Sequence, residues 1–210
     1  MRNLTAAHIK RLKLVIFVLA LLPLLRLIER GVQNNLSANP LEFITRATGD
    51  WAIYFLCLTL LVTPLRRVTG LNWLLRLRRL LGLYVFFYAF LHFLCFLWFD
   101  HFFDLEEMVK DIVKRPFIAV GFAAFVLLVP LAVTSSDRLM RQLGRWWGRL
   151  HRLIYGVALL AVLHFWWMKS GKNNLQEPMI IALVMVLLLG SRVVFIWRAR
   201  RPPENVAEPD

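Results

Sequence analysis

Two long runs of the sequence contain no Asp, Glu, Lys or Arg: Leu80–Phe99 and Pro116–Ser136. Each has about 20 residues, and a helix of that length, rising about 1.5 Å per residue, crosses the roughly 30 Å hydrocarbon core of a bilayer. The apolar content of the whole chain, 59%, also exceeds the roughly 45–50% typical of soluble domains. The sequence therefore predicts a membrane protein built from helices.

Four further segments are apolar enough to be spans: Leu12–Ile28, Ile44–Leu65, Arg149–Met168 and Pro178–Trp197. The last contains Arg192, whose long stem lets the guanidinium extend toward the headgroups. The first is short and resembles a secretory signal peptide, but no small-residue cleavage site follows it, so we expect it to be retained. We predict an all-α polytopic bundle with six transmembrane helices over residues 12–197, a leader at 1–11 and a tail at 198–210.

The charges of the short connections predict how this bundle is oriented. Eighteen of the 26 Lys and Arg residues lie on the side that carries both termini, and eight lie on the other side. Because such an excess marks the cytoplasmic side, both termini are predicted to be cytoplasmic. The net charge of +13 then needs no nucleic-acid partner, because topology and contact with anionic membrane lipids account for it.

Three histidines fall within the predicted spans, where ionisable side chains are rare and by default indicate a functional site. His92 lies 13 residues after Arg79, and His164 lies 15 residues after Arg149, which places them about 20 Å and about 22 Å from the cytoplasmic side. Their helices run in the same direction, so the two imidazoles can face each other at equal depth. Opposed imidazoles are what bis-histidine heme ligation requires. The alternative is a pair of neutral imidazoles, each bonded to a neighbouring helix.

A zinc site is less well supported, because no cysteine or carboxylate lies at the depth of His92 and His164 to complete a tetrahedron. His151, 13 residues before His164, lies about 20 Å closer to the cytoplasm. The facing positions are Arg78 and Arg79, which cannot act as ordinary metal ligands. Three interpretations of His151 stay open: a second heme with an unusual or absent sixth ligand, a different cofactor, or a hydrogen bond to a carbonyl or a propionate.

Basic residues cluster at the same predicted depth, among them Arg78, Arg79 and Arg149. Guanidinium groups pair well with carboxylate and phosphate, so these residues are candidates to bind heme propionates, a flavin phosphate or lipid headgroups. His8 and His101 are expected to be ordinary surface residues. The acidic connection between the third and fourth spans is expected to be a solvated turn with an amphipathic segment, with a docking surface as the alternative.

Several motifs, in a fixed order, carry a family resemblance. They are RRLLGL at Arg78–Leu83, His92, RPF at Arg115–Phe117, TS at Thr134–Ser135, LGRWWGRLHRLIY at Leu143–Tyr155, and His164. In this order and spacing the chain resembles the MsrQ (YedZ) family, the heme-binding membrane subunits of the bacterial periplasmic protein-methionine-sulfoxide reductase system. That family belongs to the ferric-reductase-like transmembrane group.

The resemblance implies an electron-transfer subunit in the bacterial inner membrane that is not itself catalytic. Electrons would pass through b-type heme, and through FMN, to a periplasmic molybdopterin-containing reductase that repairs methionine sulfoxide in oxidised proteins. The family's heme-iron ligands fall on His92, His151 and His164. The wider group has two histidines on each ligand helix, whereas this chain has only His92 on the third span. The resemblance therefore implies one heme and leaves a second open.

Two other functions compete with this one. A self-contained reductase drawing on nicotinamide would need a nucleotide-binding fold, for which the 13 residues after Trp197 are too few. The expected donor is therefore the quinone pool or a separate cytoplasmic flavin reductase. The second alternative is a small helical transporter or scaffold with structural histidines, which would be colourless when purified.

Overall fold

The structure is a computed structural model that describes residues 4–171 and 175–200. Its regular structure within these ranges is entirely helical, which confirms the predicted all-α class. The α-helices are α1 (Ala6–Val32), α2 (Pro40–Thr69), α3 (Leu75–Cys95), α4 (Leu105–Lys114), α5 (Pro116–Val133), α6 (Asp137–Leu143), α7 (Arg145–Leu150), α8 (Leu153–Ser170) and α9 (Gln176–Arg200). A 3₁₀ turn at Asn72–Leu74 precedes α3, and a π-helical turn at Phe96–Asp100 extends it.

Within the described residues, five helical stretches are long and apolar enough to cross a membrane, and they correspond to the second through sixth predicted spans. They are Pro40–Thr69, Asn72–Asp100, Pro116–Val133, Arg145–Ser170 and Gln176–Phe195. The first of these begins four residues before the predicted Ile44, because the Asn39 side chain caps α2 and Pro40 occupies its first turn. It ends where Gly70 adopts a left-handed conformation with φ 71°.

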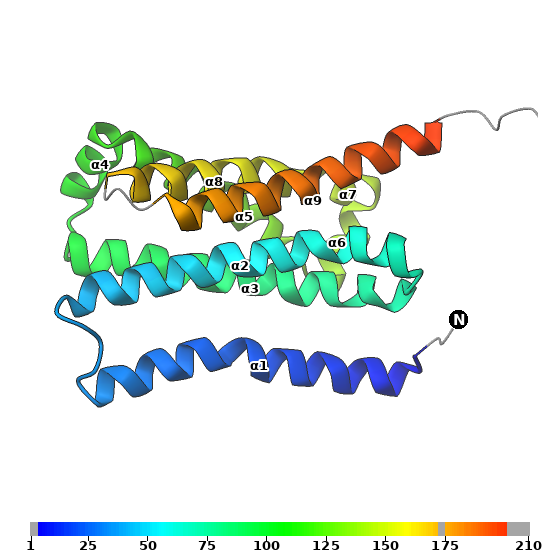
Figure 1. Ribbon diagram of the computed structural model, residues 1–210, viewed down its shortest axis with the longest axis horizontal. Helices are drawn as coiled ribbons and strands as arrows, with labels where there is room; N and C mark the ends of the chain where they lie inside the picture. The colour runs from blue at the N-terminus through cyan, green and yellow to red at the C-terminus, as the bar shows by residue number, and fades with distance from the viewer. Residues whose placement is uncertain (1–3, 172–174, 201–210) are drawn as a thin grey trace, which may run out of the picture.

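Helix α1 is the predicted first span, and it is not among those five. It is helical over 27 residues, but charged side chains leave an uncharged run of only 12 residues, Leu14–Leu25. It extends alongside α2 and α3 as a separate rod (Figure 1). A sixth crossing therefore stays a prediction.

The other long helices form two antiparallel pairs, with α2 packed on α3 and α5 packed on α8, while α9 lies against α2 and α8. Figure 1 shows the beginning of α1, the α2–α3 connection, α6, α7 and the last turns of α9 at one end of the bundle. We call this the basic end, because the larger group of Lys and Arg residues lies there. The opposite end carries α4 and the α1–α2 connection, and we call it the α4 end.

Aromatic residues of α3 attach α1 to the bundle. The Tyr84 hydroxyl donates to the Phe17 carbonyl at 2.7 Å, and the Tyr88 hydroxyl donates to the Ala20 carbonyl at 2.7 Å. Phe55 of α2 stacks on both tyrosine rings, with centroids 5.3 and 5.4 Å away. Buried hydroxyls that reach backbone carbonyls of a neighbouring helix satisfy their polar groups where water is excluded.

The connection between α3 and α5 contains an amphipathic helix, as the sequence predicts. Asp104 caps α4 by accepting from the backbone N–H groups of Glu106 and Glu107. Leu105, Val109 and Val113 are exposed together on another face of this helix. A helix with one charged and one apolar face suits the boundary between headgroups and acyl chains.

Candidate functional site

His92 of α3 and His164 of α8 lie next to each other between the two helix pairs. Their ring centroids are 6.1 Å apart and their ring planes are inclined at 71°. The two residues are 72 positions apart in the sequence, so only the parallel course of α3 and α8 brings them together. The depth comparison along the two predicted spans anticipates this juxtaposition.

Each of the two rings is hydrogen-bonded to a backbone carbonyl of the helix on which its own helix packs, α2 for His92 and α5 for His164. Nδ1 of His92 lies 2.8 Å from the Thr45 carbonyl oxygen on α2, and Nδ1 of His164 lies 2.7 Å from the Phe117 carbonyl oxygen on α5. A carbonyl only accepts, so each Nδ1 carries the proton, and each Nε2 keeps a lone pair. No described residue is hydrogen-bonded to either Nε2. This tautomer, fixed by a carbonyl on the other nitrogen, is the usual state of a metal-binding histidine.

Glycines make room for both rings. Gly49 and Gly121 each follow the carbonyl-bearing residue by four positions, so they lie on the same helix face one turn further on. A Cβ at Gly49 would lie 3.1 Å from Nδ1 of His92, and one at Gly121 would lie 2.7 Å from Nδ1 of His164. In the sequence these positions are marked only by two four-residue spacings, Thr45 to Gly49 and Phe117 to Gly121. The spacings cannot be interpreted until it is known that these helices face the histidines.

The geometry of the histidine pair fits a metal bound between two imidazoles. Metal–nitrogen bonds of about 2.0–2.1 Å, with roughly 1 Å from each nitrogen to its ring centre, put two such rings roughly 6 Å apart. Among the described residues, no group of three or more His, Cys, Asp or Glu side chains could hold a metal ion. The pair therefore suits a metal whose remaining ligands come from a macrocycle, as in heme.

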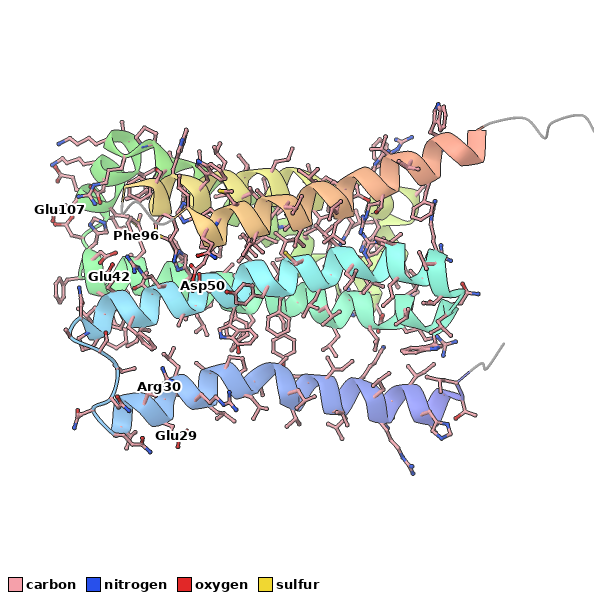
Figure 2. The ribbon with its side chains drawn as sticks, in the orientation of Figure 1. Glu29, Arg30, Glu42, Asp50, Phe96 and Glu107 are labelled. Atoms are coloured by element: carbon pink, nitrogen blue, oxygen red, sulfur yellow. The ribbon has the colours of Figure 1, made fainter. Side chains whose placement is uncertain are left out.

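Charged residues lie close to the histidine pair. Lys169 of α8 is 8% exposed, and its Nζ is 2.6 Å from Oε2 of Glu177. Asp50, which follows Gly49 on α2, lies within electrostatic range of both. Figure 2 shows Asp50 on the side of α2 that faces α8 and α9. These three residues therefore place charged groups in the bundle near the histidine pair.

A cavity of about 380 Å³ lies between α1 and α2. Its lining includes Thr48, which precedes Gly49, and Tyr88, which lies one turn before His92 on α3. Arg26 and Arg30 of α1 lie on its wall as well. Its volume is in the range of small-molecule sites.

His101 differs from its expected surface position. It is 6% exposed, because its ring packs against Phe96 at 4.6 Å and its Nε2 lies 3.5 Å from a carboxylate oxygen of Asp111. The π-helical turn and the positive φ angles of Phe102 (47°) and Phe103 (66°) fold the chain back over this histidine. Sequence position alone carried no signal for that reversal. His8 is exposed, as expected.

His151 lies near the basic end and is held by protein groups. Its ring stacks on Trp147 with centroids 4.0 Å apart, and its Nε2 is 3.2 Å from the Thr134 hydroxyl. That hydroxyl donates to the Pro130 carbonyl at 2.6 Å, so it must accept from Nε2 of His151. The tautomer is therefore the reverse of that in the histidine pair. His151 is brought neither to His92 nor to His164.

The three candidate arginines have different surroundings. Arg79 forms an exposed ion pair with Asp137, and Arg149 is exposed with its guanidinium 4.4 Å above the Trp146 ring. Arg78 is half-buried and lies within electrostatic range of Tyr155 and Arg192. Arg78 is therefore the least exposed of the three.

Arg192 is the residue that sequence reasoning misjudged. It does not extend toward the headgroups but is 8% exposed, with Nη1 donating to the Tyr155 hydroxyl and Nη2 donating to the Leu60 carbonyl, each at 2.7 Å. Leu60 precedes Pro64 by four residues in α2, and proline has no N–H to donate to that carbonyl. Pro64 indicates in the sequence that the Leu60 carbonyl lacks its helical donor. The sequence does not show that a side chain of α9 donates to that carbonyl instead.

Comparison with known proteins gives a consistent set of relatives. A family model described as "Ferric reductase like transmembrane component" matches residues 48–162. A "Protein-methionine-sulfoxide reductase heme-binding subunit MsrQ" from Herminiimonas arsenicoxydans is 56% identical over 190 residues, which cover 90% of this chain and 87% of that protein. Proteins of the same name from Ralstonia nicotianae and Bordetella pertussis are 54% and 52% identical, over 92% and 94% of this chain and 89% and 96% of their own length. No solved structure matches the chain.

Proposed function

The chain belongs to the MsrQ family of heme-binding subunits, within the ferric-reductase-like transmembrane proteins, and we propose that it transfers electrons through a b-type heme held by His92 and His164. The observation that carries this proposal is the histidine pair itself. Two rings lie 6.1 Å apart, each with Nδ1 bonded to a carbonyl and Nε2 unused. Two structural histidines would satisfy their carbonyls equally well, but they would not need to leave both Nε2 atoms without a partner.

The residues around the pair determine how it works. A bound heme supplies reversible one-electron chemistry at its iron. The Thr45 and Phe117 carbonyls keep both Nδ1 protons in place, so that both Nε2 atoms present lone pairs and remain good ligands. Gly49 and Gly121 let the helix backbones approach the rings closely enough for those hydrogen bonds to form.

The position of the pair along its helices supports a direction of transfer. His164 is six residues from the end of α8, about 9 Å along the helix axis, so the pair is close to the α4 end. With both termini cytoplasmic in the inner membrane, and with α1 as a sixth crossing, the α4 end faces the periplasm. A periplasmic molybdopterin-containing methionine sulfoxide reductase, which repairs oxidised proteins, would receive the electrons there.

The donor and the second cofactor belong to the same proposal. A quinone bound in the cavity of about 380 Å³ between α1 and α2 would be one donor, and a cytoplasmic flavin reductase would instead deliver electrons at the basic end. FMN, or a second heme with His151 as one ligand, would act as an intermediate electron carrier at the basic end. Of the candidate arginines, Arg78 would contact such a cofactor, because Arg79 and Arg149 are exposed.

The test is the absorption spectrum of the purified, detergent-solubilised protein, oxidised and reduced, with heme quantified per chain. We expect a low-spin spectrum in the wild type, and loss of that heme in both His92→Ala and His164→Ala. His8→Ala, which removes an exposed histidine of α1, is the matched control and should keep the heme. Unchanged spectra in both pair variants would refute the ligand assignment, and a colourless wild type would favour the transporter or scaffold.

A further inference from the structure

We propose that Arg78, Arg192 and Tyr155 form a binding site for an anionic oxygen group, a carboxylate or a phosphate, carried by a molecule other than the heme of the histidine pair. The three side chains come from α3, α9 and α8 and meet near the basic end. In this proposal Arg192 and Tyr155 bind the anion together with Arg78, and Arg79 and Arg149 do not.

The charges at this site lack an acidic partner. Arg192 is nearly fully buried, and the guanidinium of Arg78 lies within electrostatic range of it. No described Asp or Glu forms an ion pair or hydrogen bond with either arginine; within the described chain, the hydrogen bonds of Arg192 go to Tyr155 and Leu60. A buried positive charge with a second, half-buried one near it is unfavourable unless a negative charge is placed beside them.

Unused donors are also present. Arg192 uses only two of its five N–H groups on protein atoms, and its Nε is buried with no hydrogen-bond partner among the described residues. An arginine can only donate, so the Tyr155 hydroxyl accepts from Nη1 of Arg192 and has its own proton left to donate. The site therefore offers N–H groups from two guanidiniums and one O–H, a donor set suited to carboxylate or phosphate oxygens.

This site is too far from the histidine pair to serve the same heme. Arg78 precedes His92 by 14 residues along α3, which is about 21 Å of helix. The anion must therefore belong to a second molecule: the phosphate of a flavin, the propionate of a second heme, or the headgroup of an anionic phospholipid. These sources share the same chemistry at the two arginines, and the experiment separates them.

A purely structural role for Arg192 is the competing explanation, because its Nη2 satisfies the carbonyl that Pro64 leaves without a donor. Replacing the proline tests this directly. Pro64→Ala restores a backbone N–H four residues after Leu60, so in the double variant Pro64→Ala/Arg192→Gln that carbonyl has its helical donor again. A structural role predicts that the double variant regains wild-type behaviour, whereas an anion site predicts that it does not.

The experiment uses the full chain in detergent and three probes. FMN is compared with riboflavin by flavin fluorescence, heme is compared with heme dimethyl ester for a second equivalent bound per chain, and native mass spectrometry follows retained phosphatidylglycerol. For whichever probe the wild type binds through its anionic group, Arg78→Gln and Arg192→Gln should weaken binding about tenfold or more, because charged hydrogen bonds are lost. Arg67→Gln, which removes an exposed cation lying over Phe195 of α9, should leave binding unchanged.

The proposal is overturned if the wild type distinguishes none of the three probes from its uncharged or absent counterpart, or if Pro64→Ala restores probe binding to Arg192→Gln. It rests on the proposed function only for the two cofactor sources. The low-spin heme band of the histidine pair is recorded in the same samples, so that a failure of the anion site can be distinguished from a failure of the proposed heme ligation. That band should persist in Arg78→Gln and Arg192→Gln, and its absence from the wild type would count against the histidine pair alone.

Discussion

Replacing Gly121 by alanine is the most direct test of how the histidine pair is held. The added Cβ would lie 2.7 Å from Nδ1 and 2.8 Å from Cε1 of His164, well inside van der Waals contact. The ring cannot move aside freely, because Nδ1 is bonded to the Phe117 carbonyl one turn earlier on the same helix. Either α5 and α8 separate or His164 leaves its position.

The size of the effect follows from the cost of overpacking. Forcing a methyl group into a filled interior typically costs about 1–3 kcal/mol, and every 1.4 kcal/mol is about tenfold in affinity. We therefore expect Gly121→Ala to bind heme about 5- to 150-fold more weakly than the wild type. Gly49→Ala should have a smaller effect, because its Cβ would lie 3.1 Å from His92.

The assay is heme titration of heme-depleted protein, followed by the reduced spectrum and the thermal unfolding of each variant. Gly156→Ala on α8 is the matched control, since its Cβ would make an ordinary contact, 3.8 Å from Cδ1 of Leu127. It should bind heme like the wild type. A Gly121→Ala protein with wild-type heme affinity and spectrum would refute the reasoning, and so would equal losses in Gly121→Ala and Gly156→Ala.

Two further predictions concern the basic end and α1. His151→Ala should leave the low-spin spectrum of the histidine pair intact, because its Nε2 bonds to Thr134 and not to the pair; loss of all heme in this variant would place His151 in the main site. If α1 crosses the membrane, single cysteines at Ala7 and Asn35, both exposed, should react with a membrane-impermeant thiol reagent from opposite sides, with Asn35→Cys labelled in intact cells and Ala7→Cys only after lysis. Labelling of both positions from one side would show that α1 does not cross.

Depth along a helix was enough to predict that His92 and His164 meet, because a span is nearly straight and its rise per residue is fixed. What holds the two rings was not predictable in the same way. Gly49 and Gly121 lie on other helices, and their spacing from Thr45 and Phe117 has no meaning until those helices pack against the histidines. Apolar length likewise predicts six spans, and five of them correspond to helices long and apolar enough to cross a membrane, whereas the crossing of α1 stays a prediction.

The errors at Arg192 and His101 share a physical cause. Arg192 is predicted from its nearness to a span end and His101 from its place in an acidic connection, and neither consideration describes the neighbouring helices. Arg192 turns inward because Pro64, 128 residues earlier, leaves a carbonyl without a donor. His101 is buried because a π-helical turn and two residues with positive φ reverse the chain over it. Tertiary partners decided both positions.

Helix α2 connects the two parts of the bundle that the proposals concern. Its Thr45 carbonyl holds His92 and its Leu60 carbonyl holds Arg192, 15 residues apart, which is about 22 Å along the helix. The histidine pair therefore serves only the half of the membrane next to the α4 end. A quinone in the cavity beside Tyr88 would reach the pair without any further station, whereas a cytoplasmic flavin reductase would need one at the basic end. The occupant of the site formed by Arg78, Arg192 and Tyr155 therefore bears directly on the donor: a flavin or a heme there completes a path from the cytoplasm, and a phospholipid there leaves the quinone route as the one that the helices support.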